Sequence, residues 1–267
     1  MNKSTLFLLI TLFVINLSSI AQTSSKLVTQ LMEESGTAAQ FDQLDQMIDA
    51  QIAQSTAQMS PEMIESFTKV IKTSMNGAAM KKSYHDYFTK NCSEDTVKMI
   101  LDLYKKPLVV KAKKMEVASQ DPANQADQMQ FFQNLQANPP AEERILLIAT
   151  LNQELGTMEI MAELLSNMMY AMMKGANSVA PEGEQMTDDQ LRAQIAQALP
   201  PMAIQQIQQQ IIAVSIYTYK DMSNDEIKDY TQIWATKEGK SFIRNSKNAF
   251  NYSFEAVGEK IGKTIVK

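Results

Sequence analysis

The chain has 267 residues, one cysteine, one histidine and a formal net charge of −5, and 45% of its residues are hydrophobic. The acidic balance argues against a nucleic-acid partner, which would need a basic face. One cysteine excludes a disulfide within the chain, and one histidine excludes a metal site with several histidine ligands in one chain.

The first 21 residues predict a secretory signal peptide. Lys3 is followed by an apolar run from Leu6 to Leu17, and Ser19-Ile20-Ala21 forms a small-residue cleavage signal before Gln22. The apolar run is shorter than the ~20 residues that span a bilayer, and no later segment is long and apolar enough. We therefore expect an exported protein, periplasmic or extracellular, with no transmembrane segment in the mature chain.

The rest of the chain predicts an all-α protein. Ala, Gln, Met, Leu, Lys and Glu dominate, and all of them favour helix. Glycine occurs only 8 times, and no segment alternates apolar and polar residues as a strand would. We expect a duplicated antiparallel helical bundle without a sheet.

The first half, residues 22–138, predicts helices separated by Gly, Asn and Pro signals. Ser24 or Ser25 is a suitable N-cap for the first helix, which Gly36 ends. The expected helices run from about 25 to 35, 37 to 58, 61 to 75, 78 to 91, 93 to 106, 107 to 119 and 121 to 137.

Asn138-Pro139-Pro140 predicts that the preceding helix ends there and that the connection is exposed to solvent. The second half, residues 139–267, begins at this connection. Thr187 and Gln190 have the spacing of a capping box. A loop is expected over residues 175–185. The expected helices run from about 141 to 155, 157 to 174, 187 to 199, 200 onward, 223 to 236 and 239 to 258.

The two halves resemble each other in sequence. Residues 27–37 align with 147–157 at an offset of 120, and Ser93 aligns with Ser223 at an offset of 130. One insertion in the 175–185 loop explains the difference, because surface loops tolerate insertions. We interpret residues 22–138 and 139–267 as two helical repeats. Chance similarity between two amphipathic stretches is the alternative.

The motif that organises the chain occurs at residues 93–111 and 223–240. Each copy has a capped acidic turn, an apolar face ending in Tyr104 or Trp234, and a break at Pro107 or Gly239. We expect both aromatic rings to be buried at equivalent places.

These stretches resemble the DUF2059 family. Ser223, Glu226, Ile233, Trp234, Gly239 and Lys240 match its motif in the second copy, and Ser93, Tyr104, Pro107 and Lys111 match it in the first. The first copy has Val109 in place of the usual glycine, and the second has Lys237 in place of the usual proline. The resemblance implies an exported bacterial helical protein, and it implies no activity.

No catalytic, cofactor-binding or metal-binding residue is expected. His85 and Cys92 are seven residues apart, which is about 10 Å along a helix and too far for direct proton transfer. We expect a solvated histidine and a buried thiol. The acid pairs 142–143 and 188–189 complement helix dipoles, whereas residues 33–34 lie on a solvated face. Neither a phosphate-binding glycine loop nor a nucleophile elbow occurs.

A methionine cluster offers one further chemistry. Met168, Met169, Met172 and Met173 lie within two helical turns, and thioethers can bind Cu(I). Methionine also fills gaps between packed helices, and these residues are in phase with neighbouring leucines, so we favour core packing.

Together the patterns indicate a non-enzymatic binding or interaction module. The partner is expected to be a protein or a small apolar ligand in a cleft between the repeats, lined by Met and Ile. The alternatives are a hydrolase-type enzyme without a recognisable motif and a Met-rich copper-handling protein.

Overall fold

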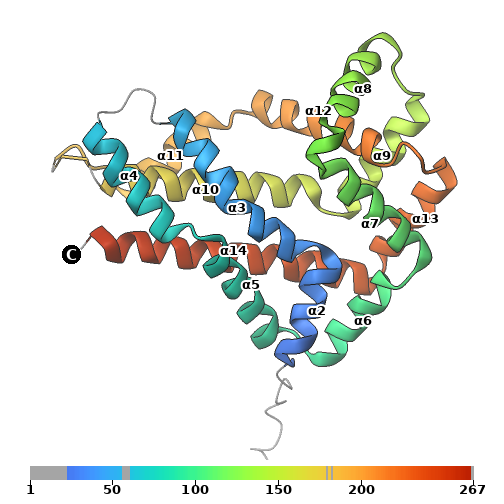
Figure 1. The fold of residues 1–267 in the computed structure, drawn as a ribbon, viewed down its shortest axis with the longest axis horizontal. Helices are drawn as coiled ribbons and strands as arrows, with labels where there is room; N and C mark the ends of the chain where they lie inside the picture. Colours follow the sequence, from blue (N-terminus) through green and yellow to red (C-terminus); the bar gives the residue numbers. More distant parts are fainter. Residues whose placement is uncertain (1–22, 56–60, 179, 182, 266–267) are drawn as a thin grey trace, which may run out of the picture.

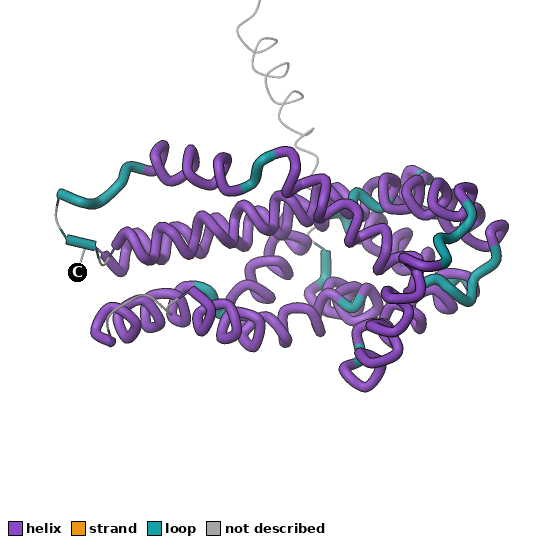
Figure 2. Tube along the Cα trace, turned by 90° about the horizontal axis from the view of Figure 1, so that it is seen from above, coloured by secondary structure: helices purple, strands orange, loops and turns teal. Residues whose placement is uncertain are grey.

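The computed structural model describes residues 23–55, 61–178, 180–181 and 183–265. Within these ranges the chain is all-α and has no β-strand, which confirms the predicted fold class (Figure 1, Figure 2). The predicted signal peptide, residues 1–21, and residues 56–60, which include the predicted end of the second helix, lie outside the described ranges. None of the described helices combines the length and apolar character that a bilayer-crossing helix needs.

The helices follow one another with short connections. In chain order they are α2 (Ser25–Ser35), α3 (Thr37–Ser55), α4 (Pro61–Ser74), α5 (Gly77–Asn91), α6 (Glu94–Tyr104), α7 (Pro107–Gln120), the 3-10 helix η1 (Pro122–Asn124), α8 (Gln125–Ala137), α9 (Glu142–Glu154), α10 (Thr157–Ser178), α11 (Asp188–Ala198), α12 (Pro201–Thr218), α13 (Asn224–Ala235) and α14 (Lys237–Ile265).

Side-chain caps explain several of the helix starts. The hydroxyl of Ser24 accepts from the backbone N–H of Leu27. Both predicted capping boxes form: Thr187 with Gln190 at α11, and Ser223 with Glu226 at α13. Each box satisfies two N–H groups that have no partner inside their helix.

Four predicted boundaries are wrong. Helix α10 continues through the buried Gly175, because packing outweighs the ~1 kcal/mol that glycine costs in a helix relative to alanine. Helix α14 extends past Gly258 to Ile265 and begins at Lys237, so Gly239 lies inside its first turn and does not make the break. The segment after Asp121 first forms a 3-10 turn and then α8.

Gly36 and Gly156 have the same conformation and the same place between two helices. Their φ angles are 77° and 61°, in the left-handed region that favours glycine. Each donates its backbone N–H to the carbonyl oxygen of the residue three positions earlier. In both places a threonine begins the next helix.

The longest helix, α14, lies at the centre of the molecule. It packs against α4, α5 and α6 of the first half and against α10 and α13 of the second (Figure 1). Helix α7 of the first half packs in turn against α12 and α13. Helix α7 of the first half and helix α14 of the second half thus each contact the other half, and the two halves share one core.

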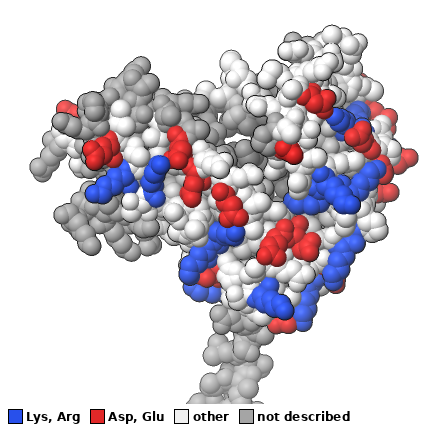
Figure 3. Space-filling model, viewed as in Figure 1, with Lys and Arg blue, Asp and Glu red and all other residues white. Residues whose placement is uncertain are grey.

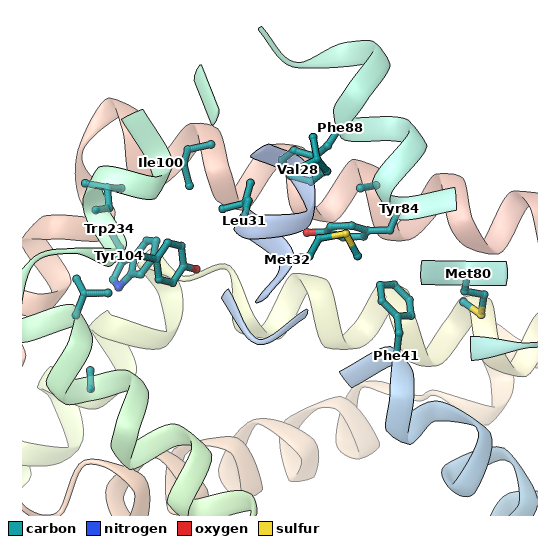
Figure 4. Packing of buried hydrophobic residues seen from close by; sticks show 14 of the residues in the cluster. Val28, Leu31, Met32, Phe41, Met80, Tyr84, Phe88, Ile100, Tyr104 and Trp234 are labelled. Carbon is teal, nitrogen blue, oxygen red and sulfur yellow. The ribbon is translucent and has the colours of Figure 1, made fainter. Parts of the chain in front are cut away.

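Aromatic rings fill the centre of this core. Tyr104 and Trp234 are 8% and 3% exposed, and their ring centroids are 5.8 Å apart (Figure 4). Phe242 of α14 contacts both of them. A second group joins Tyr84 to Phe41 and Phe250. The predicted burial of Tyr104 and Trp234 is confirmed, and the two rings are direct neighbours.

The predicted junction between the halves is a surface feature. Asn138 and Pro139 are exposed and Pro140 is half-buried. The chain needs no internal partner there, because the segment lies between α8 and α9 and its polar groups reach water.

Candidate functional site

A cleft of about 730 Å³ opens between α3, α5, α7, α8, α10 and α14. Its walls include residues of both halves, and Figure 3 shows the surface hollowed between the α3 side and the side of α7 and α8. The volume lies within the range of small-molecule sites. We call this depression the main cleft.

The floor of the main cleft is apolar. The first half contributes Phe41, Leu44 and Met80. The second half contributes Leu155, Ile160, Met161, Leu164, Phe250 and Phe254. Phe41, Met80 and Phe254 are buried, whereas Met161 is 41% exposed. The floor therefore joins the packed core to a surface that an apolar ligand can reach.

The rim of the main cleft is polar and almost uncharged. Five glutamines form it: Gln40, Gln43, Gln120, Gln125 and Gln128. Their side-chain amides form no hydrogen bond with another described residue. Asp121 is the one charged side chain among the described lining residues, and its carboxylate accepts from the backbone N–H of Ala123 at 2.9 Å. Each amide offers an acceptor oxygen and two donor N–H groups to water or to a ligand.

The α8 side of the rim is fixed to the second half by one carboxylate. Asp127 accepts from the hydroxyl of Tyr217 at 2.8 Å and from Nζ of Lys220 at 2.9 Å. The hydrogen bond from Lys220 lowers the pKa of Asp127. Lys220 also lies 4.4 Å from the centre of the Tyr217 ring. These contacts hold the first turn of α8, which carries two of the rim glutamines.

Helix α7 is fixed to the second half in a similar way. Oε1 of Glu116 accepts from the hydroxyls of Tyr219 and Tyr230 at 2.9 and 3.0 Å. Burial raises the pKa of both tyrosines well above the ordinary value, so they stay protonated and donate. Lys111 lies 2.5 Å from Oε1 of Glu226 on α13. The end of α7 at the rim is thereby positioned.

His85 and Cys92 do not form a catalytic pair. Nε2 of His85 lies 3.1 Å from the hydroxyl of Ser25, and the imidazole is half-buried, so the ring is only partly solvated. Its ring packs beside α2, which covers it in part. Cys92 is 2% exposed, and burial raises the pKa of its thiol to about 11. The predicted buried thiol is confirmed, and neither residue lines the main cleft.

The methionine cluster is described only in part. Met169 and Met173 are half-buried, and the side chains of Met168 and Met172 lie outside the described set. No group of three or more His, Cys, Asp or Glu side chains suited to a metal ion occurs among the described residues.

The sequence predicted part of the lining of the main cleft. Met80, Met161 and Ile160 agree with the expected Met and Ile. The phenylalanines and the glutamine rim were not predicted. Glutamines are frequent between residues 120 and 136. Because solvent-facing helix surfaces often carry glutamine, this frequency did not indicate a binding site.

Comparison of the chain with protein-family models, with curated proteins and with solved structures gives no match. The resemblance to the DUF2059 family therefore stays a prediction.

Proposed function

We propose that this chain is an exported, non-enzymatic binding protein whose ligand is a small apolar molecule held in the main cleft. The observation that carries the proposal is the cleft itself. It has an apolar floor, a polar rim and a volume of about 730 Å³, and residues of both halves line it. Such a combination is typical of ligand sites.

The chemistry of the lining supports binding more than catalysis. Its described hydroxyl and carboxyl groups belong to Ser119, Thr157 and Asp121. The hydroxyl of Ser119 donates to the carbonyl oxygen of Glu116, and the carboxylate of Asp121 accepts from the backbone of η1. A hydrolytic nucleophile needs a base within hydrogen-bond reach, and these contacts offer none.

Export is part of the same proposal. It is supported by the signal-peptide pattern of residues 1–21 and by the resemblance of residues 93–111 and 223–240 to the DUF2059 family. The periplasm or the extracellular space is the expected location.

We also propose that residues 22–138 and 139–267 are copies of one unit. The matched φ angles of Gly36 and Gly156, and the matched caps Ser93 and Ser223, support this origin. So does the reciprocal packing of α7 and α14 on the opposite halves. An experimental structure in which these paired positions failed to superpose would overturn the proposal.

Binding can be tested with a neutral apolar fluorophore, N-phenyl-1-naphthylamine. In the purified protein we expect saturable enhancement of its fluorescence. Leu164→Trp fills the main cleft and should weaken probe affinity by roughly tenfold. Met202→Trp is the matched control, because Met202 is 70% exposed and lies outside the lining.

Circular dichroism must show that both variants are folded. Unchanged affinity in Leu164→Trp, or equal loss in both variants, would contradict the assignment of the ligand to the main cleft. If the parent protein bound no probe at all, the result would contradict the proposed binding function itself.

A further inference from the structure

The main cleft separates its two chemistries. Apolar side chains come mainly from α10 and α14, for example Leu164 and Phe254, whereas glutamines of α3, α7 and α8 provide the polar rim. A ligand that matches both surfaces has an apolar body on the floor and a polar group at the rim. The two surfaces together fit a molecule that is apolar over most of its length and carries one polar group.

The rim also limits the charge of that polar group. A glutamine side chain is neutral and offers one acceptor oxygen and two donor N–H groups. No lysine or arginine occurs among the described residues that line the main cleft. Lys220, which packs against α8, is paired with Asp127 and lies over the Tyr217 ring. An anionic head would therefore lose hydration without gaining a cation.

One further feature disfavours an anion. The carboxylate of Asp121 lies on the rim itself. The helix ends at the cleft give no preference for either charge, because the C-terminal end of α7 and the N-terminal ends of α8 and α10 all contribute lining residues. A cationic head gains little from Asp121, because that side chain is exposed and exposed ion pairs are weak.

We infer that the ligand of the main cleft is an uncharged amphiphile, with one apolar chain and a neutral head that exchanges hydrogen bonds with the glutamine rim. The inference rests on the proposed binding function. The inference adds that the glutamine amides select the head group of the ligand. They favour a neutral head over a charged one.

The test compares three amphiphiles with matched alkyl chains: monodecanoylglycerol, decanoate and decyltrimethylammonium. Each is titrated into the full chain by calorimetry at neutral pH, below its micelle concentration. We expect the neutral glyceride to bind at least about tenfold more tightly than decanoate, and more tightly than the cation. Equal or tighter binding of decanoate or of the cation would overturn the inference while leaving the binding function intact. Failure of all three to bind would count against the binding function as well.

A charge substitution sharpens the test. Gln128→Lys places a cation on the rim, and it should reduce the preference for the glyceride over decanoate by about tenfold. Gln130→Lys is the matched control, because Gln130 lies on the same helix, is exposed and is absent from the lining. The preference should stay unchanged there. An equal change in both variants would show that net charge and not the rim sets the preference, and the inference would fail.

Discussion

The two copies of the organising motif make the same helix–break–helix connection with different close packing. Between α6 and α7, Lys106 has φ −64° and ψ 133°. Between α13 and α14, Thr236 has φ −63° and ψ 162°. Both are extended residues that directly precede the second helix of their connection. The common geometry comes from the backbone, since the two sequences differ at the break.

The copies differ in the first turn after the break. Val109 of α7 has a buried side chain, 1% exposed. At the matching place in α14, a Cβ on Gly239 would lie 2.5 Å from the carbonyl oxygen of Trp234. Helix α14 therefore approaches the end of its preceding helix more closely than α7 does. The first copy fills this space with a side chain, and the second fills it with backbone.

The largest loss of stability is expected where Tyr104 of the first copy contacts Trp234 of the second. Trp234→Ala should lower the free energy of unfolding by ~3–5 kcal/mol, because truncation of a buried aromatic leaves a cavity. Tyr104→Phe is the control, because it keeps the ring that contacts Trp234. It should cost well under 1 kcal/mol, since no described residue forms a hydrogen bond with the Tyr104 hydroxyl. Urea unfolding followed by circular dichroism measures both. Similar costs for the two variants would contradict the shared aromatic core.

The next largest loss of stability is expected when Val109 and Gly239, the residues that distinguish the copies, are each replaced by the other copy's residue. Gly239→Val forces the backbone of α14 away from Trp234 and should cost ~1–3 kcal/mol or more. Val109→Gly removes a buried side chain and loosens a helix, and it should cost about 3 kcal/mol. Thermal unfolding measures both. Both substitutions should therefore lower the melting temperature.

Val117→Gly separates burial from helix propensity. Val117 also lies on α7 but is 60% exposed, so its replacement should cost under about 0.5 kcal/mol. If Val109→Gly cost no more than Val117→Gly, packing at Val109 could not explain the difference between the copies.

Local signals in the sequence predicted most of the helices. Ser24, Thr187 and Ser223 are caps because their hydroxyls accept from N–H groups within the next turn. Pro107 and Pro201 begin helices, where a missing N–H costs nothing. These interactions join residues only a few positions apart, so their pattern is visible without a structure.

The features that the sequence did not reveal depend on distant contacts. Gly239 looked like a turn residue, but its role is set by the carbonyl oxygen of Trp234. Glu116 looked like any helical acid, but it accepts from two tyrosines more than 100 positions later. The glutamine rim depends on how α7 and α8 are held against the second half. Periodicity predicts which face of a helix is buried, but not which helix covers that face.

The smallest expected effect is a pH-dependent contribution to stability from the helix cap of the second copy, which the cap of the first copy lacks. Glu226 closes the capping box of α13 and bonds Lys111, whereas the first copy has the uncharged Thr96 at the corresponding place. The bond from Lys111 lowers the pKa of Glu226 in the folded protein. A carboxyl whose pKa falls on folding stabilises the fold above its unfolded pKa, and that stabilisation disappears as the pH falls through the folded pKa.

Glu226→Gln should therefore unfold at a lower temperature than the parent at neutral pH, and the difference should shrink at a pH well below 4.5, the ordinary pKa of the carboxyl. The effect is small because the side chains of Glu226 and Lys111 are 35% and 39% exposed, and water and salt screen such pairs. Thr96→Val is the matched variant in the first copy, and its change in melting temperature should be the same at both pH values. Other carboxylates titrate in the same range, so the quantity to compare is the difference between variant and parent at each pH. A difference for Glu226→Gln that did not change with pH would mean that the second cap acts through its geometry alone, as the first cap does.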